Sequence, residues 1–132
     1  MPSIFSKIIA GEIPAHKVAE DDHYLAFLDI MPVVKGHTLV IPKVEIDYYF
    51  DLEDATLAGL QVFAKPIAKA LQRVVPCQRI GVAVAGLEVP HAHVHLIPMN
   101  KIADISFGQD RQRAEDAELA ELAAEIRAHL HE

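Results

Sequence analysis

The stretch that most constrains the fold is the run His-Ala-His-Val-His-Leu-Ile-Pro at positions 91–98, in which three histidines alternate with small or apolar residues. Successive side chains of a β-strand point to opposite faces, so a strand places His91, His93 and His95 on one face and the intervening residues on the other. In a helix the three histidines would spread over about 200° and share no face. The run therefore predicts a strand with an apolar face toward the core and an imidazole face toward a cleft or solvent.

Three interpretations of the imidazole face are open. Histidines two positions apart lie roughly 6.6 Å apart and can converge on one metal ion, whereas the first and third lie about 13 Å apart, too far to share a zinc ion. Alternatively, one imidazole acts as a nucleophile while its neighbours bind charge or move protons. The third interpretation is a set of surface histidines on an edge strand, which the clean alternation and the terminal Pro98 argue against.

The run matches the signature of the histidine triad (HIT) family, and three further blocks occur in the family's order. These blocks are Ile-Phe-Ser-Lys-Ile-Ile-Ala-Gly-Glu-Ile-Pro at 4–14, Ala-Phe-Leu-Asp-Ile at 26–30 and Gly-His-Thr-Leu-Val-Ile-Pro-Lys at 36–43. The chain thus resembles the nucleotide-binding branch of the family over roughly residues 3–100. The resemblance implies a homodimer that needs no metal or other cofactor and cleaves a purine nucleoside monophosphate from a leaving group, as in an adenosine phosphoramidate.

Length and composition indicate one globular domain over residues 1–132, since 132 residues with 52% hydrophobic content can build a core of their own. The formal net charge is −7, and residues 104–132 hold eight acidic residues and three arginines, a net −5. We therefore expect the acidity to belong to this C-terminal segment and not to the site. No basic stripe is present, which argues against nucleic acid as a partner.

The expected location is the cytoplasm. No apolar run approaches the 18 or so residues of a membrane span, and the N-terminal residues show no secretory signal. Cys77 is the single cysteine, so no internal disulfide can form, and this composition fits a reducing compartment.

The hydrophobic pattern predicts an α+β fold: a five-stranded, mostly antiparallel sheet with a long central helix and a C-terminal helix. The expected elements are a helix at 4–10 capped by Ser3, strands at 16–20, 23–29 and 37–41, a long helix that Asp51 caps and Pro76 ends, a strand at 79–85, the triad strand and a helix at about 112–130. Asp21-Asp22 predicts a hairpin turn between the first two strands. Pro66 lies inside the long helix, where we expect a kink.

The resemblance also implies roles for four histidines. The middle histidine of the triad, His93, attacks the α-phosphorus and forms a nucleotidyl-histidine. His95 contacts the phosphate oxygens and assists the leaving group. His91 orients His93, partly through its backbone carbonyl, and His37 matches a fourth histidine that joins this network.

The implied nucleotide-binding residues lie mostly in the first two blocks. Asp29 is predicted to accept hydrogen bonds from both ribose hydroxyls, although the residues alone favour a turn-forming aspartate at a strand end. The residues that match the base pocket, and that would otherwise be assigned to the core, are Phe5, Ile8, Ile13, Phe27 and Ile30.

Two departures from the family pattern bear on the chemistry. Relatives with structural zinc carry a Cys-x-x-Cys pair where this chain has Ser3 and Ser6, and a histidine near the position of Glu45, so we expect that zinc site to be absent. In the loop before the triad, Leu87 and Glu88 replace the usual glutamine and hydroxyl residue. Backbone N–H groups of Glu88 and Val89 can still meet a phosphate, but a carboxylate at this place repels one unless it turns away.

Alternative functions follow from these departures. Within the family, the alternative is a dinucleoside polyphosphate hydrolase. The unusual Leu87-Glu88 pair favours a catalytically weak module that binds nucleotides or a protein partner. From a different class, a metal-dependent hydrolase would use His37, His93 and His95 as ligands.

Overall fold

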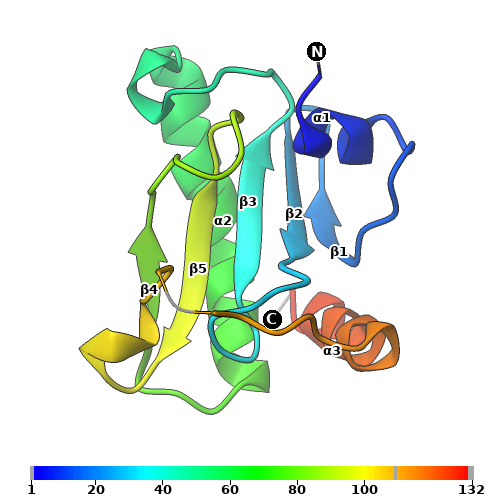
Figure 1. Cartoon of the computed structure of the whole chain (residues 1–132), viewed down its shortest axis with the longest axis vertical. Helices are drawn as coiled ribbons and strands as arrows, with labels where there is room; N and C mark the ends of the chain where they lie inside the picture. Colours follow the sequence, from blue (N-terminus) through cyan, green and yellow to red (C-terminus); the bar gives the residue numbers. More distant parts are fainter. Residues whose placement is uncertain (1, 109, 131–132) are drawn as a thin grey trace.

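The predicted α+β architecture is confirmed by a computed structural model, which describes residues 2–108 and 110–130 (Figure 1). The elements in chain order are α1 (Ile4–Ile9), β1 (Lys17–Glu20), β2 (Tyr24–Leu28), β3 (Thr38–Pro42), the 3₁₀ turn η1 (Tyr49–Asp51), α2 (Asp54–Val74), β4 (Arg79–Ala83), β5 (Val94–Met99), the 3₁₀ turn η2 (Ile102–Asp104) and α3 (Asp116–Ala128). The strands form one sheet in the order β1-β2-β3-β5-β4, and each pair of neighbours is antiparallel.

The β1–β2 hairpin forms at the predicted turn. The Asp21 carboxylate accepts hydrogen bonds from the backbone N–H groups of His23 and Tyr24, each at 2.8 Å, and so fixes the reversal of the chain. At the other end of this region, the Ser3 hydroxyl accepts from Ser6 N–H and caps α1 as expected. Gly11 follows the helix with a φ of +81°, a conformation that favours glycine.

The two faces of the sheet bury separate apolar clusters. On one face the large cluster joins the sheet to α2 and α3, with Leu28, Leu60 and Ile126 fully buried; α2 lies along this face in Figure 1. On the other face α1 covers a smaller cluster that includes Phe5 and Phe27. Each fully buried leucine, isoleucine or phenylalanine contributes about 1.5–3 kcal/mol, so both faces add to stability.

Asp51 does not cap the long helix, and this prediction was wrong. Asp51 belongs to η1, whose hydrogen bond from Leu52 N–H to the Tyr49 carbonyl carries the Leu52 side chain into the core. Helix α2 therefore begins at Asp54, and no side chain caps its N-terminus. The helix continues through Pro66 to Val74, shortly before the predicted stop at Pro76.

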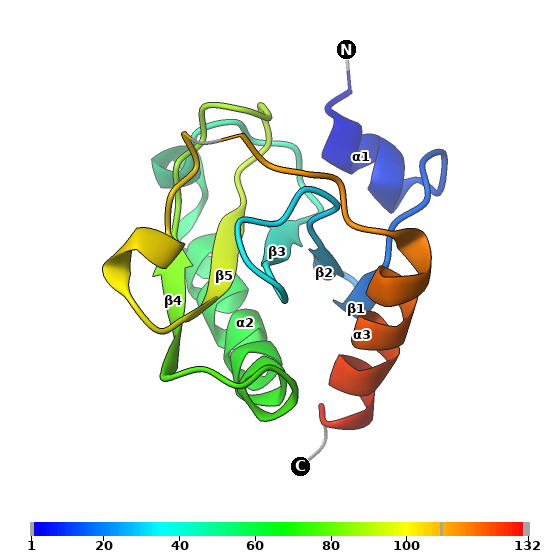
Figure 2. The ribbon, with the colours of Figure 1, turned by 60° about the horizontal axis from the view of Figure 1, so that its bottom comes forward.

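Other element boundaries also differ from the prediction, most of them by one or two residues. Strand β4 ends at Ala83 instead of residue 85. Helix α3 begins at Asp116 instead of residue 112, because the preceding residues run extended across the molecule, with the N–H of Ala114 bound to the carbonyl of Ile30 at 2.8 Å. Figure 2 shows this segment crossing from the β4–β5 side to the start of α3. Within the described residues, no helix is long and apolar enough to cross a membrane.

Candidate functional site

The imidazole face predicted for the triad is present, although the regular strand begins only at Val94. His91 lies in a bend and His93 in irregular backbone just before β5, where the N–H of Ala92 binds the carbonyl of Ile46 at 2.7 Å. The alternation continues through this segment, because Ala92 and Val94 lie in the large core cluster, on the face opposite the histidines. The histidines are themselves almost fully buried, so they line an enclosed site and not an open surface.

His93 and His95 open into a cavity of about 230 Å³ beside α1 and the end of β2. The predicted binding residues that line the same cavity are Phe5, Ile8, Ile13, Phe27, Asp29, Ile30, Glu88 and Val89. His37 and His91 lie behind it, in contact with the two lining histidines. The structure thus gathers all of the sequence-predicted residues in one place.

The hydrogen bonds of His93 determine which of its nitrogens can react. Its Nδ1 lies 2.6 Å from the carbonyl oxygen of His91. A carbonyl oxygen only accepts, so Nδ1 carries a proton, and in the neutral ring the lone pair is on Nε2. The ring also packs edge-on against Phe5, with centroids 5.1 Å apart, so its orientation is set from two sides. Nε2 is therefore the nitrogen of His93 that has no hydrogen-bond partner among the described residues.

His91 is held from both ends of its ring. Its Nε2 donates to the carbonyl of Pro42 at 2.8 Å, and its Nδ1 accepts from the hydroxyl of Ser3 at 2.8 Å. Burial lowers the pKa of His91, in spite of the Pro42 carbonyl and the nearby Glu45, which favour the charged form. His91 is thus a neutral, fully bonded residue whose backbone carbonyl fixes His93.

The hydrogen bonds of His37 determine the tautomer of His95. The backbone N–H of Val33 donates to Nδ1 of His37 at 3.1 Å, so Nε2 of His37 carries the proton and donates to Nδ1 of His95 at 2.8 Å. His95 consequently carries its own proton on Nε2, where it can serve a partner other than His37. Burial, with nearby positive charge as a smaller cause, lowers the pKa of His37 to about 3 and that of His95 to about 4.

The two carboxylate oxygens of Asp29 have different surroundings. Its Oδ1 accepts from Met31 N–H at 2.8 Å and closes the turn after β2. Its Oδ2 faces the cavity, 3.7 Å from Nη1 of Arg111 and 3.7 Å from Nδ1 of His37. Burial raises the pKa of Asp29, an effect that the Met31 N–H and the Arg111 charge oppose. One carboxylate oxygen thus has a structural contact while the other is turned to the site.

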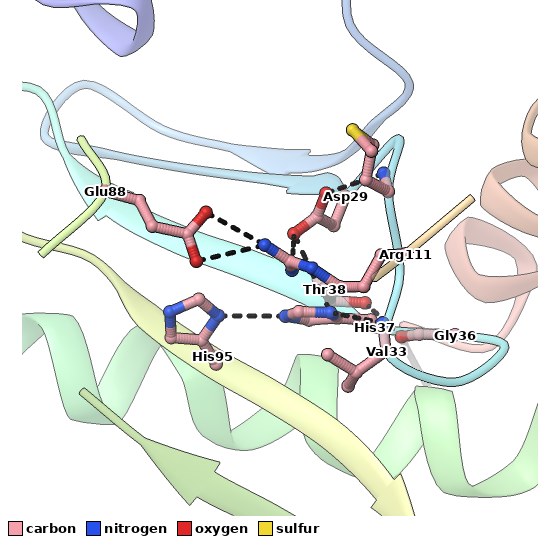
Figure 3. A network of polar contacts seen from close by, with 9 residues as sticks. Asp29, Val33, Gly36, His37, Thr38, Glu88, His95 and Arg111 are labelled. Atoms are coloured by element: carbon pink, nitrogen blue, oxygen red, sulfur yellow. Dashed lines mark hydrogen bonds and ion pairs between the residues drawn. The ribbon is translucent and has the colours of Figure 1, made fainter. Parts of the chain in front are cut away.

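Arg111 is a site residue that the sequence analysis missed. Figure 3 shows its guanidinium between Glu88 and Asp29, above the paired rings of His37 and His95. Nη2 donates to both carboxylate oxygens of Glu88, at 3.0 and 2.8 Å. Arg111 belongs to the C-terminal segment, which has a net negative charge. The net charge of this segment did not indicate that Arg111 enters the cavity. Its contact with Glu88 joins residues 23 positions apart, which a local pattern does not predict.

The comparisons with known proteins agree with this geometry. The HIT domain family pattern matches residues 10–102, most of the chain. This chain belongs to the HIT family. The protein Hit of Bacillus subtilis is 48% identical over 103 residues, which span 72% of this chain and 69% of that protein. The adenosine 5′-monophosphoramidase HNT1 of Saccharomyces cerevisiae is 38% identical over 130 residues, which span 96% of this chain and 82% of that enzyme.

Solved HIT structures share the fold. A HIT-like protein of Bartonella henselae involved in cell-cycle regulation, solved with an unknown ligand, aligns with a TM-score of 0.85 at 35% identity and covers 96% of this chain and 95% of its own. A zinc-bound HIT protein of Mycobacterium smegmatis aligns with a TM-score of 0.82 at 30% identity. The alignment covers 97% of this chain and 92% of that protein.

A cluster of hydrogen bonds occupies the place where the resemblance puts zinc ligands in other HIT proteins. Glu45 accepts from the backbone N–H of Ser3 at 2.6 Å and from the hydroxyl of Ser6 at 2.7 Å, and these bonds lower its pKa. The Ser3 hydroxyl continues the chain of contacts to His91. In this HIT protein, these hydrogen bonds tie the start of α1 to the triad, in addition to the packing of Phe5 against His93.

The described part of the chain, residues 2–108 and 110–130, offers no donor set for a metal centre. No group of three His, Cys, Asp or Glu side chains in these ranges has a geometry that could hold a metal ion. In particular, His37 and His95 direct nitrogens at each other, 2.8 Å apart, instead of at a common point. The alternative in which His37, His93 and His95 share one ion thus finds no support in this geometry.

Proposed function

We propose that this HIT protein releases a nucleoside 5′-monophosphate, most simply a purine nucleotide, from a phosphoramidate or similar conjugate through a nucleotidyl intermediate on His93. The observation that carries the proposal is the 2.6 Å contact between Nδ1 of His93 and the carbonyl of His91, which leaves the lone pair on Nε2. Nucleophilic attack on phosphorus requires an oriented imidazole at the cavity with its lone pair on the nitrogen that faces the substrate.

The reaction proceeds in two displacements. In the first, the Nε2 lone pair of His93 forms a bond to the α-phosphorus while the bond to the leaving nitrogen breaks. That electron pair stays on the amine, which takes a proton from water. In the second, a water oxygen bonds to the phosphorus, the Nε2–P bond breaks with its electrons returning to His93, and the water proton leaves to solvent. The products are the free amine and the nucleoside monophosphate.

His95 supports both displacements as a hydrogen-bond donor. Its Nε2–H is held in the correct tautomer by His37 and lies at the cavity wall, where it can bind a phosphoryl oxygen. The pKa of about 4 keeps His95 neutral near pH 7. His95 therefore stabilises developing negative charge through one N–H bond, a contribution of the kind made by a donor in an oxyanion hole.

The rest of the cavity matches a nucleoside. Its apolar half is formed by Phe5, Ile8, Ile13, Phe27 and Ile30, which offer flat and branched surfaces for a base. Oδ2 of Asp29, which makes an ion pair with Arg111 at 3.7 Å, lines the same cavity and can accept from ribose hydroxyls. The 38% identity to a yeast adenosine 5′-monophosphoramidase supports adenosine as the first nucleoside to test.

We also infer that residues 1–132 act as one domain, pair as a homodimer and work in the cytoplasm. Strand β4 is an edge of the sheet, and Val82 on this strand is 55% exposed. Val62 on the neighbouring helix α2 is 70% exposed. An edge strand with apolar side chains is a surface that a second copy of the chain can cover.

The test is turnover of adenosine phosphoramidate by the purified protein and by His93→Ala, each with and without EDTA. We expect AMP release that survives EDTA and is lost in the variant, whose fold is checked by circular dichroism. Normal turnover by His93→Ala would remove His93 as the nucleophile. Faster cleavage of a diadenosine polyphosphate would favour that substrate class, and AMP binding without any turnover would favour a nucleotide-binding module.

A further inference from the structure

The role of Arg111 goes beyond the residues that the proposed mechanism uses. Among the described residues that line the cavity, Arg111 is the one with a permanent positive charge. Its side chain is only 14% exposed, although it comes from an irregular segment between η2 and α3. A guanidinium placed this deep beside two histidines must serve either the ligand or the architecture.

The contacts of Arg111 are unequal. Nη2 donates to both oxygens of Glu88, whereas Nη1 is 3.7 Å from Asp29, beyond hydrogen-bond distance. The Glu88 side chain is 58% exposed, so it can turn into solvent at little cost, while the guanidinium stays buried. The partner that can leave is therefore the carboxylate.

We propose that Arg111 binds the negatively charged phosphate of the nucleotide, and that Glu88 holds the guanidinium until the phosphate replaces its carboxylate. The inference rests on the proposed function, because it takes the ligand to be a nucleotide. A phosphate and a carboxylate both present paired oxygens to a guanidinium, so the exchange replaces one set of charge-assisted hydrogen bonds by another.

The electrostatics of the site agree with this role. His37 and His95 stay neutral near pH 7, since their pKa values are lowered to about 3 and about 4. They can donate hydrogen bonds but bring no full charge. A phosphoryl group gains negative charge on its oxygens during transfer and is stabilised by fixed positive charge. Arg111 supplies that charge, and in the resting site Glu88 neutralises it.

If Arg111 served only to hold the fold, its replacement would affect AMP binding for a different reason. In that case the pair of Arg111 and Glu88 would only fasten the segment across the cavity, together with the bond from Ala114 N–H to the Ile30 carbonyl. Replacing Arg111 would then weaken AMP binding only by leaving Glu88 unpaired and repulsive. Removing the Glu88 charge first separates the two roles.

The experiment measures AMP and adenosine binding by calorimetry for the wild type, Glu88→Gln and the double variant Glu88→Gln/Arg111→Ala. Adenosine lacks the phosphate, and neither ligand is turned over. We expect Glu88→Gln to bind AMP at least as tightly as the wild type. We expect the double variant to bind AMP about 10-fold or more weakly than Glu88→Gln, with adenosine changed less than about 2-fold.

Two further variants serve as controls for the role of the Arg111 guanidinium. Arg113→Ala removes an arginine of the same segment that contacts Asp116 and the Ala114 carbonyl outside the cavity, and it should bind both ligands like the wild type. Arg111→Lys keeps the charge without the planar guanidinium, and it should retain part of the preference for AMP over adenosine.

Equal AMP affinity in Glu88→Gln and the double variant would overturn the inference while leaving the proposed function intact. Equal affinity of the wild type for AMP and adenosine would also overturn it, because no phosphate contact would then be measurable. Failure of the wild type to bind either ligand would overturn both the inference and the proposed function.

Discussion

At the scale of single residues, the tautomer of each site histidine follows from a partner of known polarity. The His91 carbonyl can only accept from His93, and the Val33 N–H can only donate to His37. The first contact places a lone pair on His93, and the second, through His37, places a proton on the cavity side of His95. Two backbone groups thus assign different chemistry to two neighbouring imidazoles.

Burial of His37 and His95 makes the free energy of unfolding depend on pH. His37 and His95 have pKa values of about 3 and about 4 in the folded protein, against 6.5 for an ordinary histidine, so below pH 6.5 the unfolded chain binds protons that the folded state does not. The stabilisation is complete above pH 6.5 and is lost as the pH falls toward 4. We expect the free energy of unfolding to fall by roughly 4 kcal/mol between pH 7.5 and pH 5.

Urea denaturation followed by circular dichroism at these pH values measures the effect. His95→Asn removes one of the two titrating groups and should make the fall with pH less steep. A free energy of unfolding that stays constant from pH 7.5 to pH 5 would contradict the prediction.

Oδ2 of Asp29, the carboxylate oxygen that does not close the turn, leads to a second prediction at this scale. Asp29→Asn can keep the oxygen that accepts from Met31 N–H but loses the charged acceptor facing the cavity. We expect AMP to bind about 10-fold more weakly, because hydrogen bonds to charged groups contribute about 1.5–3 kcal/mol. Binding of 2′,3′-dideoxy-AMP should change little. Equal losses for the two ligands, measured by calorimetry, would argue against a ribose contact.

At the scale of elements, the short helix α1 acts as a support for the triad. Six helical residues are too few to be stable alone, so α1 depends on its buried face and on the contacts at its N-terminus. The Ser3 hydroxyl accepts from Ser6 N–H and donates to His91. One side chain therefore both begins the helix and orients the residue that fixes His93.

Ser3→Ala tests this double role. It removes a helix cap and leaves Nδ1 of the buried His91 without its partner, so we expect a loss of about 2 kcal/mol in the free energy of unfolding. Because His91 then loses a restraint, turnover should fall more than KM rises. Ser6→Ala is the matched control, since the hydroxyl of Ser6 is 3.5 Å from His91 and bonds mainly to Glu45. Similar losses in the two variants would show that Ser3 has no special role.

At the scale of the whole molecule, the chain closes on itself at the end of the sheet. The segment before α3 crosses this end and places Arg111 in the cavity (Figure 2). Helix α3 is then held against β1, with Arg127 donating to the Lys17 carbonyl at 2.6 Å and His16 contacting Asp116 at 3.1 Å. Contacts between α3 and the start of β1 thus hold the C-terminal helix beside the N-terminal part of the sheet.

The exposed edge at β4 gives the prediction for the assembly. We expect light scattering after size-exclusion chromatography to give about twice the chain mass of 14.5 kDa. Val82→Lys adds a charge to this edge strand and should shift the protein toward the monomer. A monomer mass for the wild type at micromolar concentration would contradict the homodimer.

The sequence by itself determined the periodic features. Alternation at residues 91–98 predicted the face that the histidines share, and turn and cap chemistry at Asp21 and Ser3 predicted how two elements begin. These predictions succeed because side-chain direction and local hydrogen bonding depend on residues a few positions apart.

Only the tertiary structure decided the long-range contacts. Nothing near Arg111 in the sequence indicates that it meets Glu88, and nothing near Ser3 indicates that it holds His91, 88 positions away. The late start of α3 has the same origin, since Ala114 uses its N–H to bind the Ile30 carbonyl. These contacts form because packing of the sheet and helices brings distant segments together. A local sequence pattern does not indicate which distant residues will meet.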